Sequence, residues 1–372
     1  MPSISFPLTF WTSSAWQVGG LAVASLGVLA VLLALLVYVL TFHPKPVQSE
    51  RIVFVGEQQA PSSEFEELKV LSWNMHYMAG QDYLFYFDSA DGPGPTEKPS
   101  LERMEENTAA AARVINDESA DIVFLQEIHE NDAPTHHHEQ LCALLSQLEG
   151  YCCYAQTFYW KARFVPHPKI MGSVGKTLVT LSRLPMSGAL RYQLPKVKMD
   201  LLSSQFYLKR AVLGAELPRE GAEAVHLLHT HLDAFGLGDT MERQVAYLQD
   251  LLAEKDRLGV PWILAGDFNM LASRRCFERL HEVMRPFFNP ETELQPLLDR
   301  YRCVPSVEDV AGDDYERWLT HFPNVHPAVT WPDSTIDYIF YSSHLELVEK
   351  RVRREDTEGI SDHYPIVARF RL

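Results

Sequence analysis

Three short clusters of polar residues near the C-terminus each adjoin an apolar segment typical of a buried strand. They are Gly266-Asp267-Phe268-Asn269, Ile336-Asp337-Tyr338-Ile339-Phe340 and Ser361-Asp362-His363-Tyr364-Pro365. Asp267 and Asn269 are two residues apart, so both side chains can face the same side of an extended turn. Carboxylate and amide oxygens are ligands of hard cations, and imidazole transfers protons near neutral pH. These residue types together indicate a metal-assisted hydrolytic reaction.

Upstream segments end in the same kinds of side chain. Two apolar runs end at Asn74 and Glu127, and His231 follows a third run, Leu227-Leu228-His229-Thr230. A carboxylate such as Glu127 at the end of a buried strand is unfavourable unless it is paired or coordinates a metal. Phosphodiester hydrolysis needs a hard cation, a water made nucleophilic and support for the leaving oxygen. The strand ends therefore supply what a divalent-metal phosphodiesterase site requires.

Each of these residues alone has an ordinary structural explanation. An Asp after a Gly is usually a turn residue, and a lone His is usually a surface or core residue. Isolated turns do not explain why all the clusters occur together in this order. The segments resemble the endonuclease/exonuclease/phosphatase superfamily, whose members include pancreatic deoxyribonuclease, apurinic endonucleases, inositol polyphosphate 5-phosphatases and neutral sphingomyelinases. The resemblance is carried by Trp73-Asn74, Gln126-Glu127, Leu181-Ser182-Arg183-Leu184-Pro185, Thr230-His231-Leu232 and the three C-terminal clusters.

The resemblance implies a four-layer α/β sandwich, of the deoxyribonuclease and sphingomyelinase type, and a set of site residues. Glu127, with Asn74, would hold the catalytic Mg²⁺, which Mn²⁺ could replace. His363 would act on the attacking water and would be oriented by Asp337. Because members of the superfamily differ over whether this histidine or Asp267 is the base, both assignments stay open.

The resemblance also implies roles for the remaining polar residues of the clusters. Asp267 and Asn269 would position the water and the phosphate. His231 would stabilise the charged pentacovalent phosphate. Asp362 would assist in the metal or histidine network.

Strand-like and helical segments alternate along the chain, which indicates an α/β layered fold with two packed sheets. The pattern predicts strands at residues 69–73, 121–126, 151–159, 176–181, 210–216, 224–232, 260–265, 336–341 and 366–372. It predicts helices at residues 101–116, 138–148 and 240–255, the first with Ser100 as its N-cap. Two insertions, residues 80–99 and 271–328, interrupt the pattern. The aromatic run at residues 83–87 could touch lipid or substrate, and packing on the domain is the favoured interpretation.

The N-terminal region predicts a membrane anchor. Residues 18–42 contain no charged side chain, and Leu, Val and Ala dominate residues 21–40. This is long enough to cross the hydrocarbon core, which takes about 20 apolar residues. A cleaved signal peptide would show a basic start, a shorter apolar run and a small-residue cleavage site, and none is clear. We therefore expect an anchor at residues 1–43, a tether at 44–67 and a catalytic domain at 68–372.

The charge of the chain bears on its partners. The formal net charge is -16, and no Asp, Glu, Lys or Arg precedes Lys45. A strong acidic excess disfavours nucleic acid, because phosphate neutralisation supplies most of the affinity of a duplex-DNA binder. Local basic clusters occur at residues 196–198, 209–210 and 351–354. Lys45 and Arg51 follow the apolar span, so the positive-inside rule favours a cytoplasmic domain, and Glu50 partly offsets them.

Three functions are compatible with this sequence. A membrane-tethered phosphodiesterase acting on a lipid such as sphingomyelin is favoured by the anchor, the acidic charge and Thr230-His231-Leu232-Asp233-Ala234, which is similar to the sphingomyelinase version of that strand. A nuclease would need a basic groove. A phosphoinositide or other phosphomonoester phosphatase is a variant of this second function with the same chemistry, but no distinctive basic motif supports it. A non-catalytic binding module would have lost a metal or base residue, and none is lost here.

Other motifs have simpler interpretations. Residues 172–177 are similar to a Walker A loop, but Ile170 stands where that motif needs Gly, and the segment favours a strand. The run His136-His137-His138 has no acid or thiol nearby that would complete a metal site. The five cysteines have neither zinc-site nor disulfide-framework spacing, so reduced thiols are expected, with one bond involving Cys152 or Cys153 possible in an oxidising compartment.

Overall fold

The computed structural model describes residues 12–55, 65–81, 83, 85, 98–234, 238–323 and 328–372. Two mixed seven-stranded sheets form the centre of this described part. The first sheet has the order β13 (Glu346–Val352), β14 (Ile366–Arg371), β3 (Glu67–Asn74), β4 (Ile122–His129), β6 (Gly172–Ser182), β5 (Cys153–Val165), β2 (Ile52–Phe54). The second has the order β1 (Val47–Glu50), β7 (Ser187–Gln193), β8 (Ala211–Arg219), β9 (Ala222–His231), β10 (Trp262–Asp267), β12 (Asp337–Tyr341), β11 (Arg302–Val304).

The two sheets pack face to face around one apolar core. Phe124 of β4 and Leu178 of β6 belong to the same buried cluster as Leu213, Leu227 and Ile339 of the second sheet. All five side chains are at most 1% exposed. Burying a side chain of this size contributes about 1.5–3 kcal/mol, so the facing apolar rows hold the sheets together.

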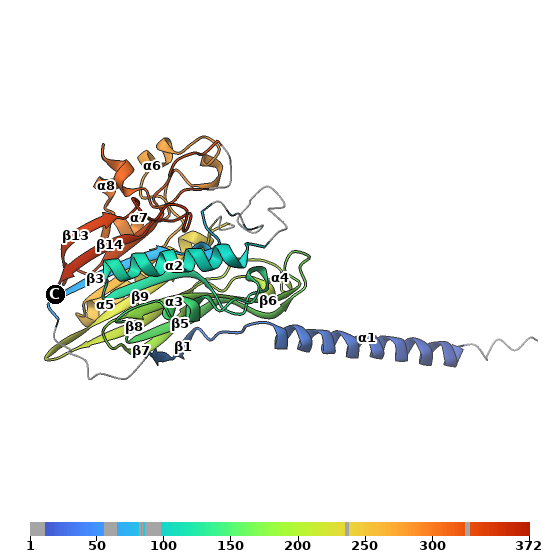
Figure 1. The fold of residues 1–372 in the computed structure, drawn as a ribbon. Coiled ribbons are helices and arrows are strands. Elements are labelled where there is room, and N and C mark those ends of the chain that lie inside the picture. Colours follow the sequence, from blue (N-terminus) through green and yellow to red (C-terminus); the bar gives the residue numbers. More distant parts are fainter. Residues whose placement is uncertain are drawn as a thin grey trace, which may run out of the picture.

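Helices cover the outer faces and complete a four-layer α/β sandwich, as predicted (Figure 1). The helix α2 (Leu101–Glu118) and the short helix α3 (Gln140–Leu145) pack on the first sheet. The helix α5 (Thr240–Leu258) packs on the second sheet together with α7 (Gln295–Leu298). The predicted N-cap of α2 is confirmed, because the Ser100 hydroxyl accepts a hydrogen bond from the backbone N of Arg103 at 3.1 Å.

The predicted tether is wrong in part. Residues 47–50 form β1 at the edge of the second sheet, and residues 52–54 form β2 at the edge of the first. The chain therefore joins the sandwich well before residue 68. The short strands β7, β11 and β13 were also not predicted, and the predicted helix at residues 138–148 is limited to α3.

The two insertions differ in their structure. Residues 271–328 contain α6 (Arg274–Arg279), α7, β11, α8 (Val307–Ala311) and the 3-10 turns η3 (Arg285–Phe287) and η4 (Tyr315–Trp318). The other short helical turns are η1 (His76–Met78), η2 (Ala133–Thr135) and α4 (Ser203–Phe206). Of the aromatic run near Tyr83, Phe85 is buried and lies edge-on to Tyr77, with ring centroids 5.0 Å apart. Residues 82, 84 and 86–97 lie outside the described part.

The helix α1 (Thr12–Leu40) projects away from the sandwich (Figure 1). Its residues 18–40 are long and apolar enough to cross a membrane, and none of that stretch is buried against the domain. Immediately after the helix, Thr41 forms an antiparallel bridge with Ala162 of β5. The chain thus passes from α1 into the sheets over only a few residues.

Candidate active site

Three neighbouring strands of the second sheet bring Asp267 between two other predicted site residues. In the strand register Asp267 of β10 lies opposite His231 of β9 on one side and Asp337 of β12 on the other. Gly266 permits this close approach, because a Cβ there would lie 1.8 Å from the carbonyl oxygen of Thr230. Packing therefore requires glycine directly before Asp267.

The first sheet supplies Asn74 and Glu127 from adjacent parallel strands. Asn74 is the last residue of β3 and lies opposite Gln126 of β4. Glu127 follows at a bulge in β4, between Leu125 and Ile128, where its φ is 59°. A bulge of this kind re-aims a side chain, and here it places Glu127 at the edge of the cavity between the sheets.

The carboxylate of Asp267 is where these groups meet. Its Oδ2 accepts a hydrogen bond from Asn74 Nδ2 at 3.0 Å and lies 3.4 Å from His231 Nε2. The same oxygen lies 3.7 Å from His363 Nε2. His231 Nδ1 in turn lies 3.9 Å from Glu127 Oε1. Residues from both sheets and from the C-terminal loop therefore converge on one small volume.

His363 forms a dyad with Asp337. Its Nδ1 lies 2.8 Å from Asp337 Oδ2, which leaves Nε2 directed at Asp267. The backbone around it is fixed as well, because Trp73 Nε1 donates to the His363 carbonyl oxygen at 2.8 Å. The Ser361 hydroxyl accepts from the His363 backbone N at 3.2 Å. This arrangement can hold and move a proton at a defined ring nitrogen.

The same contacts shift the acidities of these groups in opposite directions. Burial raises the pKa of Asp267 to about 7, and the Asp337 carboxylate adds to the rise. Burial alone would lower the pKa of His363, but Asp337 and Asp267 outweigh it and hold that pKa well above its usual value. Burial, reinforced by the charge of Arg210, holds the pKa of His231 well below its usual value. Groups with such displaced pKa values in one cavity are typical of catalytic sites.

The two remaining predicted residues occupy supporting positions. The Asn269 backbone N donates to Asp267 Oδ1 at 2.9 Å, and its side-chain Nδ2 donates to the Leu232 carbonyl oxygen at 3.1 Å. Asp362 lies beside another imidazole, with its Oδ1 3.6 Å from His76 Nδ1. The imidazoles around Asp362 outweigh the effect of its burial and hold its pKa below the usual value.

A cavity of about 300 Å³ opens over these groups. All the predicted residues except Asp337 line it, and Asp337 lies behind His363. Its lining also includes residues that the sequence did not single out as site residues. They are the apolar and aromatic residues Trp160, Tyr207, Leu208, Met284, Phe287 and Phe288, the cations Lys176 and Arg210, and the histidines His76 and His321.

The two cations come from positions that the sequence pattern had not assigned to the site. Lys176, at the end of the Walker-like segment, lies in β6 with its Nζ 3.0 Å from the Tyr77 hydroxyl and is 1% exposed. Arg210 directly precedes β8, is 8% exposed and has its Nε 3.6 Å from Asp233 Oδ1. Arg210 could have been predicted as a site residue because it is a cation at the start of an otherwise apolar strand.

The donor atoms at the site suit a hard divalent cation. Asn74 Oδ1 accepts one hydrogen bond, from the His76 backbone N at 3.0 Å, and keeps a second lone pair. The Glu127 carboxylate borders the cavity with 13% of its side chain exposed. Within the described part of the chain, Asp337 Oδ1 and His231 Nδ1 are buried without a hydrogen-bond partner. Oxygen donors beside unsatisfied buried polar atoms fit a site that binds Mg²⁺ or Mn²⁺.

Solved structures with the same fold support this architecture. An endonuclease/exonuclease/phosphatase from Beutenbergia cavernae DSM 12333 is 24% identical, with a TM-score of 0.56, over 83% of this chain and 72% of its own. The human Nocturnin catalytic domain with bound sulfate is 18% identical, with a TM-score of 0.51, over 86% of this chain and 97% of its own. A family protein from Leptotrichia buccalis C-1013-b is 15% identical, with a TM-score of 0.51, over 82% of this chain and 100% of its own.

Sequence comparison gives the family directly. No curated protein matches the chain. Residues 71–363, which are most of the chain and include the eight predicted site residues, match the Endonuclease/Exonuclease/phosphatase family. The chain therefore belongs to the endonuclease/exonuclease/phosphatase family of phosphoester hydrolases.

Proposed function

We propose that this protein is a membrane-anchored, Mg²⁺-dependent phosphodiesterase whose substrate is a phospholipid such as sphingomyelin. The observation that carries the reaction type is the convergence of the His363–Asp337 dyad, Asp267 and His231 beside Asn74 and Glu127. Asn74 and Glu127 would hold the cation, with Mn²⁺ as a possible replacement. When bound, a divalent cation neutralises phosphate charge and lowers the pKa of a coordinated water.

The residues of the chain account for the remaining requirements of the reaction. His363 and Asp267 lie 3.7 Å apart and act as the pair that accepts the proton of the attacking water. Asp337 orients the imidazole of His363 and stabilises its charged form. Asn269 fixes the Asp267 carboxylate through its backbone N, and His231 contacts the phosphate oxygens as negative charge develops.

Two features support a lipid substrate. The apolar helix α1 leads directly into the domain, so the active site is held near a bilayer if that helix spans it. The apolar residues that line the cavity, which include Trp160, Leu208 and Phe287, can accept the hydrocarbon part next to a lipid headgroup. The net charge of -16 is consistent with a substrate other than duplex nucleic acid.

One observation favours a second candidate. Lys176 and Arg210 place two buried cations in the wall of the same cavity. A substrate with a further phosphate group next to the scissile one, such as a nucleic acid or a phosphoinositide, would pair with them. A nuclease or a phosphatase of the same family is therefore the alternative.

Parallel assays of the purified full-length chain in mixed micelles decide between these substrates. Mg²⁺-dependent release of phosphocholine from sphingomyelin, without nicking of plasmid DNA, is the expected result. EDTA should abolish the activity and added Mg²⁺ should restore it. Nicking without phosphocholine release would replace the lipid assignment with a nuclease. Activity that survives EDTA would contradict the metal assignment.

A further inference from the structure

The end of α1 has a defined direction relative to the sheets. The Thr41 backbone pairs with Ala162 of β5 in an antiparallel bridge. Phe42 lies against the guanidinium of Arg191, with Cζ 5.5 Å from the ring centroid. The next segment is fixed too, because the Gln193 backbone N donates to the carbonyl oxygen of Pro46 at 2.8 Å. Helix and sandwich are therefore joined by paired backbone rather than by a loose linker.

Antiparallel pairing determines which end of the sandwich faces the α1 side. At Thr41 the chain leads away from α1. Because β5 is antiparallel to this segment, the residues of β5 that follow Ala162 lead back toward α1. The three strand residues from 163 to 165 extend roughly 10 Å in that direction, at about 3.3 Å per residue, and the turn between β5 and β6 follows them. The strand β7 is antiparallel to β1, so the residues after Gln193 also lie on the side of the domain that faces α1.

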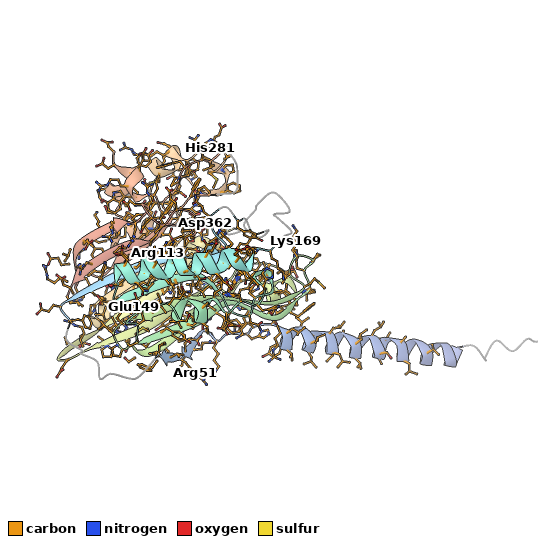
Figure 2. All side chains as sticks on the ribbon, in the orientation of Figure 1. Arg51, Arg113, Glu149, Lys169, His281 and Asp362 are labelled. Carbon is orange, nitrogen blue, oxygen red and sulfur yellow. The ribbon has the colours of Figure 1, made fainter. Side chains whose placement is uncertain are left out.

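The positions of neighbouring elements agree with this direction. The helix α4 and the adjoining end of β6 lie at the side of the domain from which α1 projects (Figure 1). Lys169, in the turn between β5 and β6, lies at that same side (Figure 2).

The strand ends that carry the candidate active site lie at this same end. The carboxyl end of β4 pairs with the start of β6, where His129 lies opposite Lys176. The carboxyl end of β9 pairs with the start of β8, where Thr230 lies opposite Val212. The cavity wall continues into the segments that face α1, because Trp160 Nε1 donates to the carbonyl oxygen of Phe206 at 2.7 Å.

Residues 163–171 and 196–206, which we call the docking edge, expose apolar side chains at this end. Met171, Leu201 and Leu202 are 61%, 84% and 62% exposed, more than any other large apolar side chain described after α1. Ile170 and Phe206 pack in one small apolar cluster, so the two segments of the docking edge lie next to each other. Exposed apolar tips on adjacent segments are typical of a surface that enters the headgroup region of a bilayer.

The charge around the docking edge is opposite in sign to that of the whole chain. Residues 160–171 contain Lys161, Arg163 and Lys169 and no acidic residue, in a chain with a net charge of -16. Residues 194–206 add Lys196 and Lys198 and contain one acidic residue, Asp200. Lys198 is paired with Asp239, with Nζ 2.7 Å from Oδ2, so the uncompensated positive charge comes mainly from residues 160–171 and Lys196. Basic residues near a membrane surface are attracted by anionic lipids.

We propose that the docking edge lies on the anionic headgroup layer of the bilayer that α1 spans. The mouth of the catalytic cavity then faces the lipid, and a membrane-borne phosphodiester reaches the site without leaving the bilayer. This inference rests on the anchoring by α1 proposed above. The docking goes beyond the anchoring, because an anchor alone would not determine the orientation of the domain on the bilayer.

Depth measurements on the full chain in lipid nanodiscs test the orientation without any assay of activity. A spin label at Leu201→Cys, in a Cys142→Ser background because Cys142 is exposed, is compared with a label at Val348→Cys. Val348 is an exposed apolar residue of β13, a strand on the far side of the domain from α1 (Figure 1). With phosphatidylserine in the nanodisc, the Leu201 label should become accessible to oxygen and protected from a water-soluble nickel complex. The Val348 label should remain in water.

Two outcomes of the depth measurement would overturn the proposal in different ways. If the chain does not float with vesicles after alkaline extraction, α1 is no anchor, and both the anchoring and the docking are wrong. If the chain floats but the Leu201 label is as exposed to water as the Val348 label, only the docking is wrong. Equal depth of the Leu201 label in phosphatidylcholine with and without phosphatidylserine would remove the electrostatic part of the proposal.

A kinetic comparison adds an independent readout. The variant Met171→Glu/Leu201→Glu/Leu202→Glu should hydrolyse sphingomyelin in nanodiscs about tenfold more slowly than the parent, which corresponds to about 1.4 kcal/mol of lost docking. Its hydrolysis of the water-soluble bis(p-nitrophenyl) phosphate should be unchanged, and Val348→Glu should change neither rate. Equal loss on both substrates would indicate damage to the site and contradict the docking. If the parent cleaves no lipid, the substrate assignment fails while the depth measurement still decides the docking.

Discussion

The candidate active site is built from pairs of side chains whose positions follow from strand register. Asp267 is flanked by His231 and Asp337 because three adjacent strands place those residues opposite one another. His363 enters from the loop before β14 and completes the dyad with Asp337. Each contact is short and buried, so removing one partner leaves a charged or polar group without compensation.

We expect Glu127→Gln and His363→Ala to reduce turnover by about 10²–10⁴-fold each, the usual contribution of an acid or base group. The first removes a negative oxygen donor and the second removes the ring that faces Asp267. Turnover at saturating substrate measures the effect, and circular dichroism verifies the fold. His136→Ala, at an exposed histidine outside the cavity, is the control and should be fully active. Near-normal turnover in both site variants would refute the site assignment.

A histidine outside the catalytic cavity should contribute to the acid stability of the domain. His229 is fully buried between the sheets, with Nε2 2.6 Å from the Gln126 amide nitrogen and Nδ1 3.2 Å from the Thr180 hydroxyl. Burial lowers the pKa of His229 to about 3. The folded state therefore favours the neutral ring, and its stability is lost as pH falls from about 6.5 toward 3.

His229→Gln should remove this pH dependence. Between pH 7 and pH 5 the parent should lose about 2 kcal/mol of unfolding free energy relative to His229→Gln, at about 1.36 kcal/mol per pH unit below 6.5. Denaturant titrations of both proteins in detergent, at the two pH values, give the difference. Parallel changes in the two proteins would show that His229 is not the titrating group.

At the level of elements, the contact between β9 and β10 is the most demanding one at the site. Gly266→Ala places a Cβ 1.8 Å from the Thr230 carbonyl oxygen and forces the strands apart. We expect a loss of about 3 kcal/mol or more of unfolding free energy, in the upper range for single substitutions. Activity should fall too, since His231 and Asp267 are aligned by this pairing.

Gly221→Ala is the matched control for that substitution. Gly221 has a φ of +69°, but a Cβ at this residue would have no heavy atom within 4 Å, so only backbone strain of about 1–2 kcal/mol opposes the change. Denaturant midpoints of the two variants measure the difference. If Gly266→Ala is no more destabilising than Gly221→Ala, the close approach of the strands is not what requires glycine at residue 266.

The elements that carry the site could be predicted from the sequence because their patterns are local. The apolar runs of β3, β4, β9 and β10 are largely buried, and each ends in a polar residue that the run itself does not explain. The helix α2 could be predicted from Ser100 and its amphipathic pattern.

Other elements and residues could not be predicted because tertiary contacts define them. The strands β1 and β2 are short edge strands with half-exposed residues, and only pairing with β7 and β5 makes them strands. Lys176 and Arg210 become candidate site residues only because the packing of the two sheets places both side chains in the wall of one cavity. His321 reaches the site from the long insertion through a bridge to His363, which sequence spacing does not reveal.

For the whole molecule, the joint between α1 and the sandwich has a kinetic consequence. Only residues 41–46 separate the helix from β1, and backbone hydrogen bonds hold them. If α1 spans a bilayer and the substrate is a lipid, as proposed above, enzyme and substrate meet by lateral diffusion within one leaflet. The rate of hydrolysis would then depend on the mole fraction of substrate in the membrane surface. Adding inert lipid while the total amount of substrate stays constant would dilute the substrate within the membrane and slow the reaction.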